Sequence, residues 1–334
     1  MRLLAALACL IAGWLGAAWA AEPQPVVIRF SHVVAPDTPK GKGALMFKQL
    51  AEERSGGRVR VEVHPNSTLY KDKDELEALQ LGAVQMLAPS LAKLGPLGAR
   101  EFEVFDLPYI FPSTEVLRAV TDGPIGRSLL KKLESRGILG LAYWDNGFKL
   151  MSANRPLLRP EDLRGLKMRI QSSKVLDAQM RALGAQPVET QFSDAFAALK
   201  DGIADGTENP PSNMFTQRMH EVQRHATLTN HGYLGYAVLV NQRFWLGLPA
   251  DLRAVLEDAM AEATRFANDI AERENDEALA AMVASRRTEF HFPTREEKDA
   301  WRRALAPVWQ AFEARIGKEL IAAIGRESER HGFK

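Results

Sequence analysis

The sequence predicts an α/β fold made of two lobes. Strand and helix patterns alternate over residues 26–88 and again from Leu166, which favours open sheets covered by helices. About 310 residues follow the first twenty, more than a single hydrophobic core usually covers. A helical pattern without glycine or proline spans residues 250–292. A helix of about 35 residues would be about 50 Å long, so we expect it to span both lobes.

The alternating strands and helices of residues 26–88 are clearly indicated by local sequence signals. Thr38 suits a helix N-cap and Pro39 the first helical position, and residues 59–64 alternate between apolar and polar side chains as a half-buried strand does. The expected elements are a strand at Val26–His32, a helix from Thr38 to Gly56, a strand at Val59–His64, a helix at Lys71–Leu81 and a strand at Val84–Ala88.

Further helix and strand patterns follow an aromatic, proline-rich connection at residues 105–112. A break of the long helix near Asn275-Asp276 is the alternative to one continuous helix. The elements expected here are helices at Glu115–Thr121 and Ile125–Ser135, a strand at Ile138–Trp144, a strand at Leu166–Ile170, helices at Ser173–Leu183 and Ser193–Asp201, a pair of strands at His225–Thr229 and Gly235–Asn241, the long helix after Pro249, a short strand at Glu289–Phe292 and helix from Thr294 to Ile324.

The N-terminus has the pattern of a secretory signal. Arg2 precedes an apolar run from Leu3 to Trp14, and Ala18-Trp19-Ala20 fits the small-x-small cleavage rule. A membrane anchor is the alternative, but the run is short of the roughly 20 apolar residues that a span needs. We therefore expect cleavage after Ala20 and a periplasmic protein.

Composition excludes several classes of function. The chain has 43 Lys and Arg against 42 Asp and Glu, and loss of residues 1–20 removes only Arg2, so the mature chain is neutral. A neutral chain gives no reason to expect nucleic acid or an anionic membrane as a partner. The one cysteine, Cys9, lies in the signal, so the mature protein has no disulfide, thiolate metal site or cysteine nucleophile.

Signatures of catalysis are missing from the sequence. It has no Gly-x-Gly-x-x-Gly or Gly-Lys-Ser/Thr phosphate loop and no Gly-x-Ser-x-Gly elbow. His220, His225 and His231 are five and six residues apart, which does not bring them to one helical face as a zinc site would require. We expect binding without chemistry, with no cofactor and no metal.

Arg169 is the strongest candidate for a binding residue. It lies between Met168 and Ile170 in a short apolar strand, and Asn209 follows in a predicted turn at Asp205–Pro210. Arginine is rarely buried without a partner, and its planar fork suits a carboxylate. A clamp for a small organic acid is one interpretation, and an internal ion pair with Asp or Glu is the other.

Four lysines are weaker candidates for the same kind of site. Lys149 lies between the two predicted sheets, and Lys40, Lys42 and Lys71 lie near helix starts that follow strands. Ligands bind at this edge of open α/β sheets, and helix N-termini favour anions. Each lysine alone is better explained as a solvated surface charge, and it is their joint occurrence at this edge that favours a site.

The order and spacing of several segments resemble the extracytoplasmic solute-binding proteins of TRAP transporters, of the DctP type. The similarity runs over nearly all of the mature chain. The segments are Asn146–Lys149, Leu163–Arg169, Phe192–Asp194, Asp205–Pro210 and Gln223–His231. The resemblance implies a periplasmic solute-binding fold with a ligand cleft between the lobes and a long helix shared by both. It places lobe I at residues 21–146 and 235–274, and lobe II at residues 147–234 and 275–334.

The resemblance also implies a set of site residues. Arg169 would form the bidentate salt bridge with the substrate carboxylate, and Asn209 would help to hold it. Lys149 takes the place of an arginine in sialic-acid-binding relatives, and lysine lacks the planar fork. Lys40 and Lys71 could meet a second carboxylate. The remaining expected pocket residues are Ser90, Ser172, Phe192 and Asn213.

We therefore expect a monomeric, non-catalytic periplasmic binding protein. By this resemblance it captures a small carboxylate, with a C4-dicarboxylate such as succinate, fumarate or malate as the best match, and delivers it to a TRAP membrane permease. An exported enzyme acting on an organic acid is one alternative, and a ligand-sensing module for a membrane receptor is another.

Overall fold

The structure is a computed structural model that describes residues 24–333; the predicted signal and its cleavage site lie outside these residues. Within that range no helix combines the length and apolarity needed to cross a membrane. The strands are β1 (Val26–Ser31), β2 (Val59–His64), β3 (Met86–Leu87), β4 (Ile138–Phe148), β5 (Leu150–Ala153), β6 (Lys167–Ile170), β7 (Gln186–Glu189), β8 (Gly206–Asn209), β9 (His225–Thr227), β10 (Tyr233–Asn241) and β11 (Glu289–His291). The α-helices are α1 (Pro39–Arg54), α2 (Glu75–Leu81), α3 (Thr114–Thr121), α4 (Pro124–Lys131), α5 (Lys174–Ala182), α6 (Ala195–Lys200), α7 (Pro211–Thr216), α8 (Gln242–Leu246), α9 (Ala250–Ser285), α10 (Arg295–Ile316) and α11 (Lys318–Arg330).

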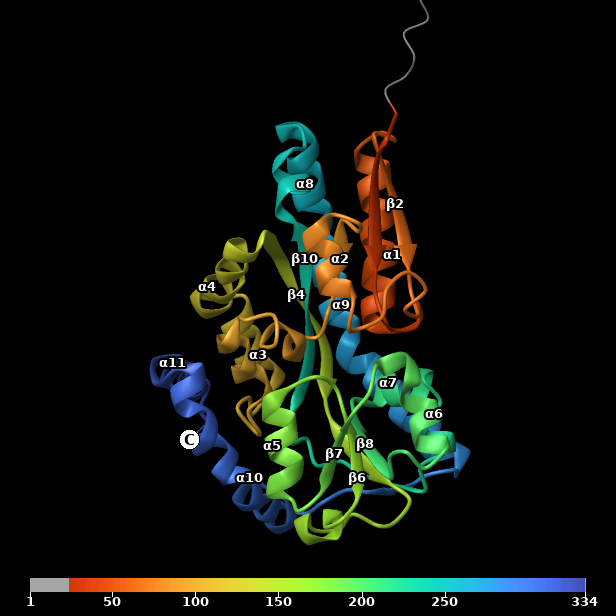
Figure 1. Cartoon of the computed structure of the whole chain (residues 1–334), viewed down its shortest axis with the longest axis vertical. Coiled ribbons are helices and arrows are strands. Elements are labelled where there is room, and N and C mark those ends of the chain that lie inside the picture. Colours follow the sequence, from red (N-terminus) through yellow and green to blue (C-terminus); the bar gives the residue numbers. More distant parts are fainter. Residues whose placement is uncertain (1–23, 334) are drawn as a thin grey trace, which may run out of the picture.

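Two sheets organise the molecule (Figure 1). The first has the order β2-β1-β3-β10-β4 and the second β11-β9-β5-β8-β6-β7. We call the part built on the five-stranded sheet lobe I and the part built on the six-stranded sheet lobe II. Both sheets are mixed, because β10 runs antiparallel to β3 and β4, and β5 runs antiparallel to β8 and β9. The two-lobed α/β fold predicted from the sequence is confirmed.

The chain crosses between the lobes more than once. β4 belongs to lobe I, and β5 begins two residues after its end in lobe II. α9 packs on α1 and β4 in lobe I and on α7 in lobe II, and Figure 1 shows it passing from one lobe to the other. It is one helix of 36 residues, so the continuous helix is confirmed and the alternative break near Asn275 is wrong. The Asn275 side chain donates to Ala271 O at 2.8 Å within the same helix.

The start of α1 directs a lysine toward the space between the lobes. The Thr38 hydroxyl accepts a hydrogen bond from Gly41 N at 3.1 Å, and Pro39 occupies the first turn, as the capping pattern predicts. A Cβ at Gly41 would lie 2.5 Å from Ala35 O, so only glycine lets the helix begin this close to the preceding loop. Lys40 is thereby placed just beyond the carboxyl end of β1.

Several local predictions differ from the structure. Asp205–Pro210 was expected to be a turn, yet Gly206–Asn209 is β8, buried between β5 and β6; sheet pairing overrides the turn-like composition. The strands near residues 225 and 235 do not pair, since β9 lies in lobe II and β10 in lobe I. α2 begins at Glu75 and not at Lys71. β5 and β7 were not expected.

The C-terminal helices pack internally on both lobes. Helix α10 ends before Gly317, whose φ of 110° starts a separate helix, α11; one continuous helix was expected. α10 packs on α5 in lobe II, while α11 packs on α3 in lobe I. The Trp309 indole donates to Pro108 O at 2.9 Å, and Arg315 Nη2 donates to Glu103 Oε1 at 2.7 Å. These contacts fasten the C-terminal segment across the two lobes.

Candidate ligand-binding site

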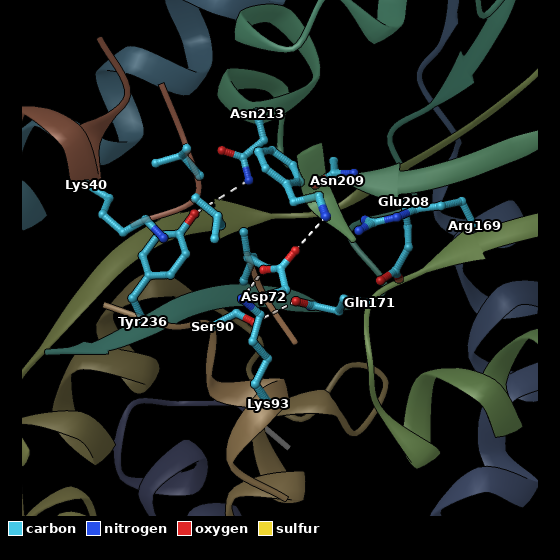
Figure 2. A pocket seen from close by; sticks show the side chains of 14 residues that line it. Lys40, Asp72, Ser90, Lys93, Arg169, Gln171, Glu208, Asn209, Asn213 and Tyr236 are labelled. Atoms are coloured by element: carbon cyan, nitrogen blue, oxygen red, sulfur yellow. Dashed lines mark hydrogen bonds and ion pairs between the residues drawn. The ribbon is translucent and has the colours of Figure 1, made fainter. Parts of the chain in front are cut away.

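A cavity lies between the lobes, where side chains from both sheets converge (Figure 2). Its volume is small, about 30 Å³. Lobe I contributes Val33, Val34, Lys40, Asp72, Ser90, Lys93, Leu234 and Tyr236, and lobe II contributes Arg169, Gln171, Phe192, Glu208, Asn209 and Asn213. Six of the nine predicted site residues are in this set: Arg169, Asn209, Lys40, Ser90, Phe192 and Asn213.

Arg169 presents a buried guanidinium to the cavity from β6. Its side chain donates to Thr190 twice, from Nε to Oγ1 at 3.2 Å and from Nη2 to the carbonyl at 2.7 Å. Among residues 24–333, no carboxylate lies within 4.0 Å of it, so the interpretation as an internal ion pair is wrong. Burial lowers the pKa of Arg169, an effect that the nearby Asp72 and Glu208 oppose. Arg169 is thus a buried cation that forms no ion pair with any carboxylate of the described residues.

Asn209 and Phe192 lie beside Arg169. Asn209 ends β8, is buried, and donates from Nδ2 to Thr207 Oγ1 at 3.4 Å. The Phe192 ring centroid is 6.0 Å from the Arg169 guanidinium carbon. The strand that carries Asn209 and the strand that carries Arg169 are parallel neighbours, which brings the two side chains to one wall of the cavity.

Lys40 is the cation on the opposite wall. Its ammonium donates to Ala88 O at 2.9 Å and lies 3.7 Å from the centroid of the Tyr236 ring. It is 1% exposed, and no carboxylate in the described part of the chain lies within ion-pair distance. Burial, reinforced by the positive charge of Lys93, lowers the pKa of Lys40 to about 7. An anion placed in the cavity would restore the stability of its charged form.

Lys93, by contrast, already has its counter-ions. Its ammonium contacts Asp72 and donates to Glu75 Oε1 at 2.7 Å. Burial disfavours its charge, but Asp72 and Glu75 outweigh this and raise the pKa of Lys93. Asp72 also accepts a hydrogen bond of 2.5 Å from Phe192 N across the cleft. Asp72 therefore links the two lobes. Because Asp72 and Glu75 already neutralise Lys93, a ligand carboxylate would stabilise its charge less than that of Lys40.

Lys149 lies behind the cavity and does not line it. Its ammonium and Glu208 Oε1 are 2.7 Å apart, and His231 Nε2 and Glu208 Oε2 are also 2.7 Å apart. Burial opposes ionisation of Glu208, but Lys149 and His231 outweigh it and lower its pKa to about 2. In this structure Lys149 therefore neutralises a buried carboxylate.

Two further predicted residues also lie outside the lining set. Lys71 is about half exposed and pairs with Asp194 at 3.1 Å across the cleft. Ser172 lines a neighbouring groove at the cleft mouth, together with Gln171 and Leu97. Ser90, which does line the cavity, donates to Gln171 Oε1 at 2.5 Å and so forms another contact between the lobes.

Sequence reasoning missed Tyr236, Lys93 and Gln171. Tyr236 lies in the apolar run Tyr233–Asn241, where an aromatic residue is typical of a core strand. Lys93 is in a short 3₁₀ segment, Leu91–Leu94, that had no recognisable pattern. Only Gln171 carried a usable signal. It lies two residues after Arg169, just past the end of β6, and alternate residues of an extended segment share one face.

The described residues include no cluster of three or more His, Cys, Asp or Glu side chains that could hold a metal ion. The polar groups around the cavity are instead amides, hydroxyls, the cations of Arg169, Lys40 and Lys93, and the carboxylates of Asp72 and Glu208. Each of these two carboxylates has a lysine partner, Lys93 for Asp72 and Lys149 for Glu208. The amides, hydroxyls and cations can hold an anion through charge-assisted hydrogen bonds.

Comparison with known proteins identifies the family. The model of bacterial extracellular solute-binding protein family 7, DctP, matches residues 30–315. A C4-dicarboxylate-binding periplasmic protein of Rhodobacter capsulatus is 63% identical over 323 residues, which is 97% of each chain. One from Shewanella loihica is 42% identical and is covered over 95% of its length and 96% of this chain.

Solved structures agree with this result. A TRAP periplasmic solute-binding protein from Shewanella oneidensis with bound succinate is 42% identical, with a TM-score of 0.89 over 91% of this chain and 99% of that one. A Pseudomonas aeruginosa relative with bound L-malate is 46% identical, with a TM-score of 0.84 over 86% of this chain and 100% of that one. The predicted family is confirmed: the chain belongs to bacterial extracellular solute-binding protein family 7, the DctP family, and is an extracytoplasmic solute-binding protein and not an enzyme.

Proposed function

We propose that this protein captures a C4-dicarboxylate such as succinate, fumarate or malate in the periplasm and delivers it to a TRAP membrane permease. One observation carries the proposal. Arg169 and Lys40 enter one small cavity from opposite lobes, and in the described residues neither has a carboxylate partner. A short dianion supplies one carboxylate to each of them.

The residue roles follow from this geometry. One carboxylate binds Arg169 and Asn209 on the lobe II wall, and the other binds Lys40 on the lobe I wall. Lys71 and Lys149 are less suited to the second carboxylate, because each already has an acidic partner, Asp194 and Glu208 respectively. The structure therefore favours Lys40 over the other predicted lysines.

The placement of the two cations supports a short ligand. Arg169 and Lys40 face one small cavity from opposite lobes (Figure 2), so a ligand that reaches both needs two carboxylates joined by a short chain. The relatives described above support the same ligand class, since they are named for C4-dicarboxylates or were solved with succinate or L-malate bound.

Binding at both walls also explains how a ligand could control the lobes. A dianion held by Arg169 and Lys40 makes its full set of contacts only when the lobes are closed, and such differential contact is what shifts a conformational equilibrium. We propose that the permease recognises this closed form. We also propose that the exported protein is a monomer, cleaved after Ala20, and that its lobes divide within a few residues of the boundaries predicted from the sequence. Residues 147–148 and 233–234, predicted in lobe II, belong to strands β4 and β10 of the lobe I sheet.

Calorimetric titration of the mature protein, freed of ligand by unfolding and refolding, tests the function. We expect succinate, fumarate or malate to bind at least tenfold more tightly than butyrate, galactonate or glutamate. Tightest binding of a monocarboxylate or a sugar acid would contradict the C4-dicarboxylate assignment. Absence of binding to any carboxylate, by protein shown to be folded, would contradict the proposed function as a whole.

A further inference from the structure

The floor of the cavity holds a tyrosine to which the proposed function assigned no role. Tyr236 lies in the middle of β10, is 2% exposed, and forms an isolated bridge with Ser90. Its ring lies under the Lys40 ammonium, and Figure 2 shows both groups at the same end of the cavity. Any group that binds Lys40 therefore also comes close to Tyr236.

Two amides act as donors to the Tyr236 hydroxyl oxygen. Asn146 Nδ2 donates to it at 2.8 Å, and Asn213 Nδ2 makes a longer contact at 3.5 Å. Asn146 Nδ2 also donates to Asn213 Oδ1 at 3.0 Å, so the two amides fix each other's orientation. In this arrangement the hydroxyl oxygen accepts from the amides, so its O–H needs a separate hydrogen-bond acceptor.

Within residues 24–333 the Tyr236 hydroxyl donates to no protein acceptor. Leaving a buried donor without an acceptor is unfavourable, and the open space beside the ring is the ligand cavity. Burial raises the pKa of Tyr236 to about 12, so the hydroxyl keeps its proton under physiological conditions. The site thus presents two donors together, the Lys40 ammonium and the Tyr236 hydroxyl.

We propose that Tyr236 is a ligand-binding residue whose hydroxyl donates a hydrogen bond to the same carboxylate that Lys40 binds. This inference rests on the proposed function. It also predicts selectivity, since a pair of donors accepts a carboxylate and disfavours an ammonium or a carboxamide N–H at that end of the ligand. The site should therefore discriminate succinate from 4-aminobutyrate and from succinamate.

Asn146 acts as a positioning residue for Tyr236, and the long helix supports it. Asn146 Oδ1 accepts from Ser212 Oγ at 3.0 Å, and its backbone carbonyl accepts from Asn275 Nδ2 at 2.7 Å. Asn275 Oδ1 in turn accepts from Ser212 N at 2.9 Å. Every polar group of the Asn146 side chain is therefore satisfied, and α9 helps to set the direction of the Tyr236 hydroxyl.

The substitution Tyr236→Phe isolates the hydroxyl, because phenylalanine keeps the ring face under Lys40. A matched control is Tyr143→Phe on the neighbouring β4, where the lost bond is from the hydroxyl to Gly126 O at 2.8 Å, outside the ligand cavity. We expect Y236F to raise the Kd for succinate about 10- to 100-fold and to weaken the preference for succinate over succinamate. Y143F should leave both unchanged.

The outcomes separate the two proposals. If wild type binds a C4-dicarboxylate and Y236F binds it equally tightly, the role of Tyr236 is wrong and the proposed function survives. If wild type binds no dicarboxylate, both proposals fail. The positioning role has its own test: Asn146→Ala should weaken succinate binding strongly in the wild-type background and much less in the Y236F background. An equal loss in both backgrounds would show that Asn146 does not act through the hydroxyl.

Discussion

Replacing Lys40 by methionine should change stability and affinity in opposite directions. Lys40 is buried and has no carboxylate partner among residues 24–333, and its pKa falls from 10.5 to about 7. A shift of about 3.5 pH units corresponds to an upper limit of about 4 to 5 kcal/mol for keeping the charge buried. The lost bond to Ala88 O and the lost contact with the Tyr236 ring offset this by about 1 kcal/mol each. A net gain of at most about 2 to 3 kcal/mol remains.

The sign of this effect depends on pH. Between pH 7 and 10.5 the unfolded chain binds the Lys40 proton more strongly than the folded, ligand-free protein does. Lys40 is therefore most destabilising at pH 7 and below, and its cost disappears as the pH approaches 10.5. The gain in melting temperature of Lys40→Met, a few degrees at most for a chain of this size, should be largest near neutral pH.

Ligand affinity should fall in the same variant. Removing one partner of a buried charge pair typically costs about 2 to 5 kcal/mol, which raises the Kd for succinate by about 30-fold or more. Thermal unfolding without ligand and calorimetric titration with succinate measure the two effects. Lys48→Met is the matched control, because Lys48 lies on the same helix at the surface, paired with Glu52. If K40M binds succinate as tightly as wild type, Lys40 does not hold the second carboxylate.

Two further predictions concern the same site, and a third concerns the contact between β4 and α9 at Gly147. Arg169→Ala should cost about 3 to 5 kcal/mol of succinate affinity, and Arg169→Lys should recover only part of it, because lysine lacks the planar fork of the guanidinium. Calorimetric titration of both variants checks this. Unchanged binding by R169A would show that Arg169 does not hold the carboxylate. Wild-type affinity for succinate should be constant just below pH 7 and fall up to tenfold per pH unit above it. The reason is that ligand-free Lys40 loses its proton near pH 7, while carboxyl groups, with a pKa of about 4, stay ionised. Titrations from pH 6.5 to 8.5 should show this fall in wild type and a flat profile in K40M. Gly147→Ala should destabilise the protein by about 1 to 3 kcal/mol, because a Cβ there would lie 2.9 Å from Asn275 Nδ2. Thermal unfolding measures this, and a fall in melting temperature that is just as large in the Asn275→Ala background would contradict that cause.

The sequence was sufficient for the features that depend on local pattern. Thr38 and Pro39 mark a helix start because capping acts within one turn, and the apolar stripe after Pro249 predicted a helix that the structure shows intact. Arg169 was recognisable because a cation inside an apolar strand contradicts the pattern around it.

What the sequence could not supply depends on contacts between distant segments. Gly206–Asn209 has the composition of a turn and becomes a strand only because β5 and β6 pair with it on either side. Lys149 and Lys40 looked like similar candidates in the sequence. Glu208, 59 residues away in sequence, neutralises Lys149, whereas no carboxylate in the described part of the chain pairs with Lys40. The role of Tyr236 depends on two amides, Asn146 and Asn213, which no periodicity connects to it.

The position of β10 has a consequence for the order in which the protein can fold. β10 lies between β3 and β4 and joins the two halves of the lobe I sheet, although it comes from residues 233–241, after most of lobe II. The first 230 residues can therefore pair β1 with β2 and β3 and can form most of the lobe II sheet, but they cannot complete the lobe I sheet. Pairings over such sequence separations slow folding, because the loop must close before the contacts form. The lobe I sheet thus stays incomplete until nearly three quarters of the chain is available, whichever lobe begins to fold first.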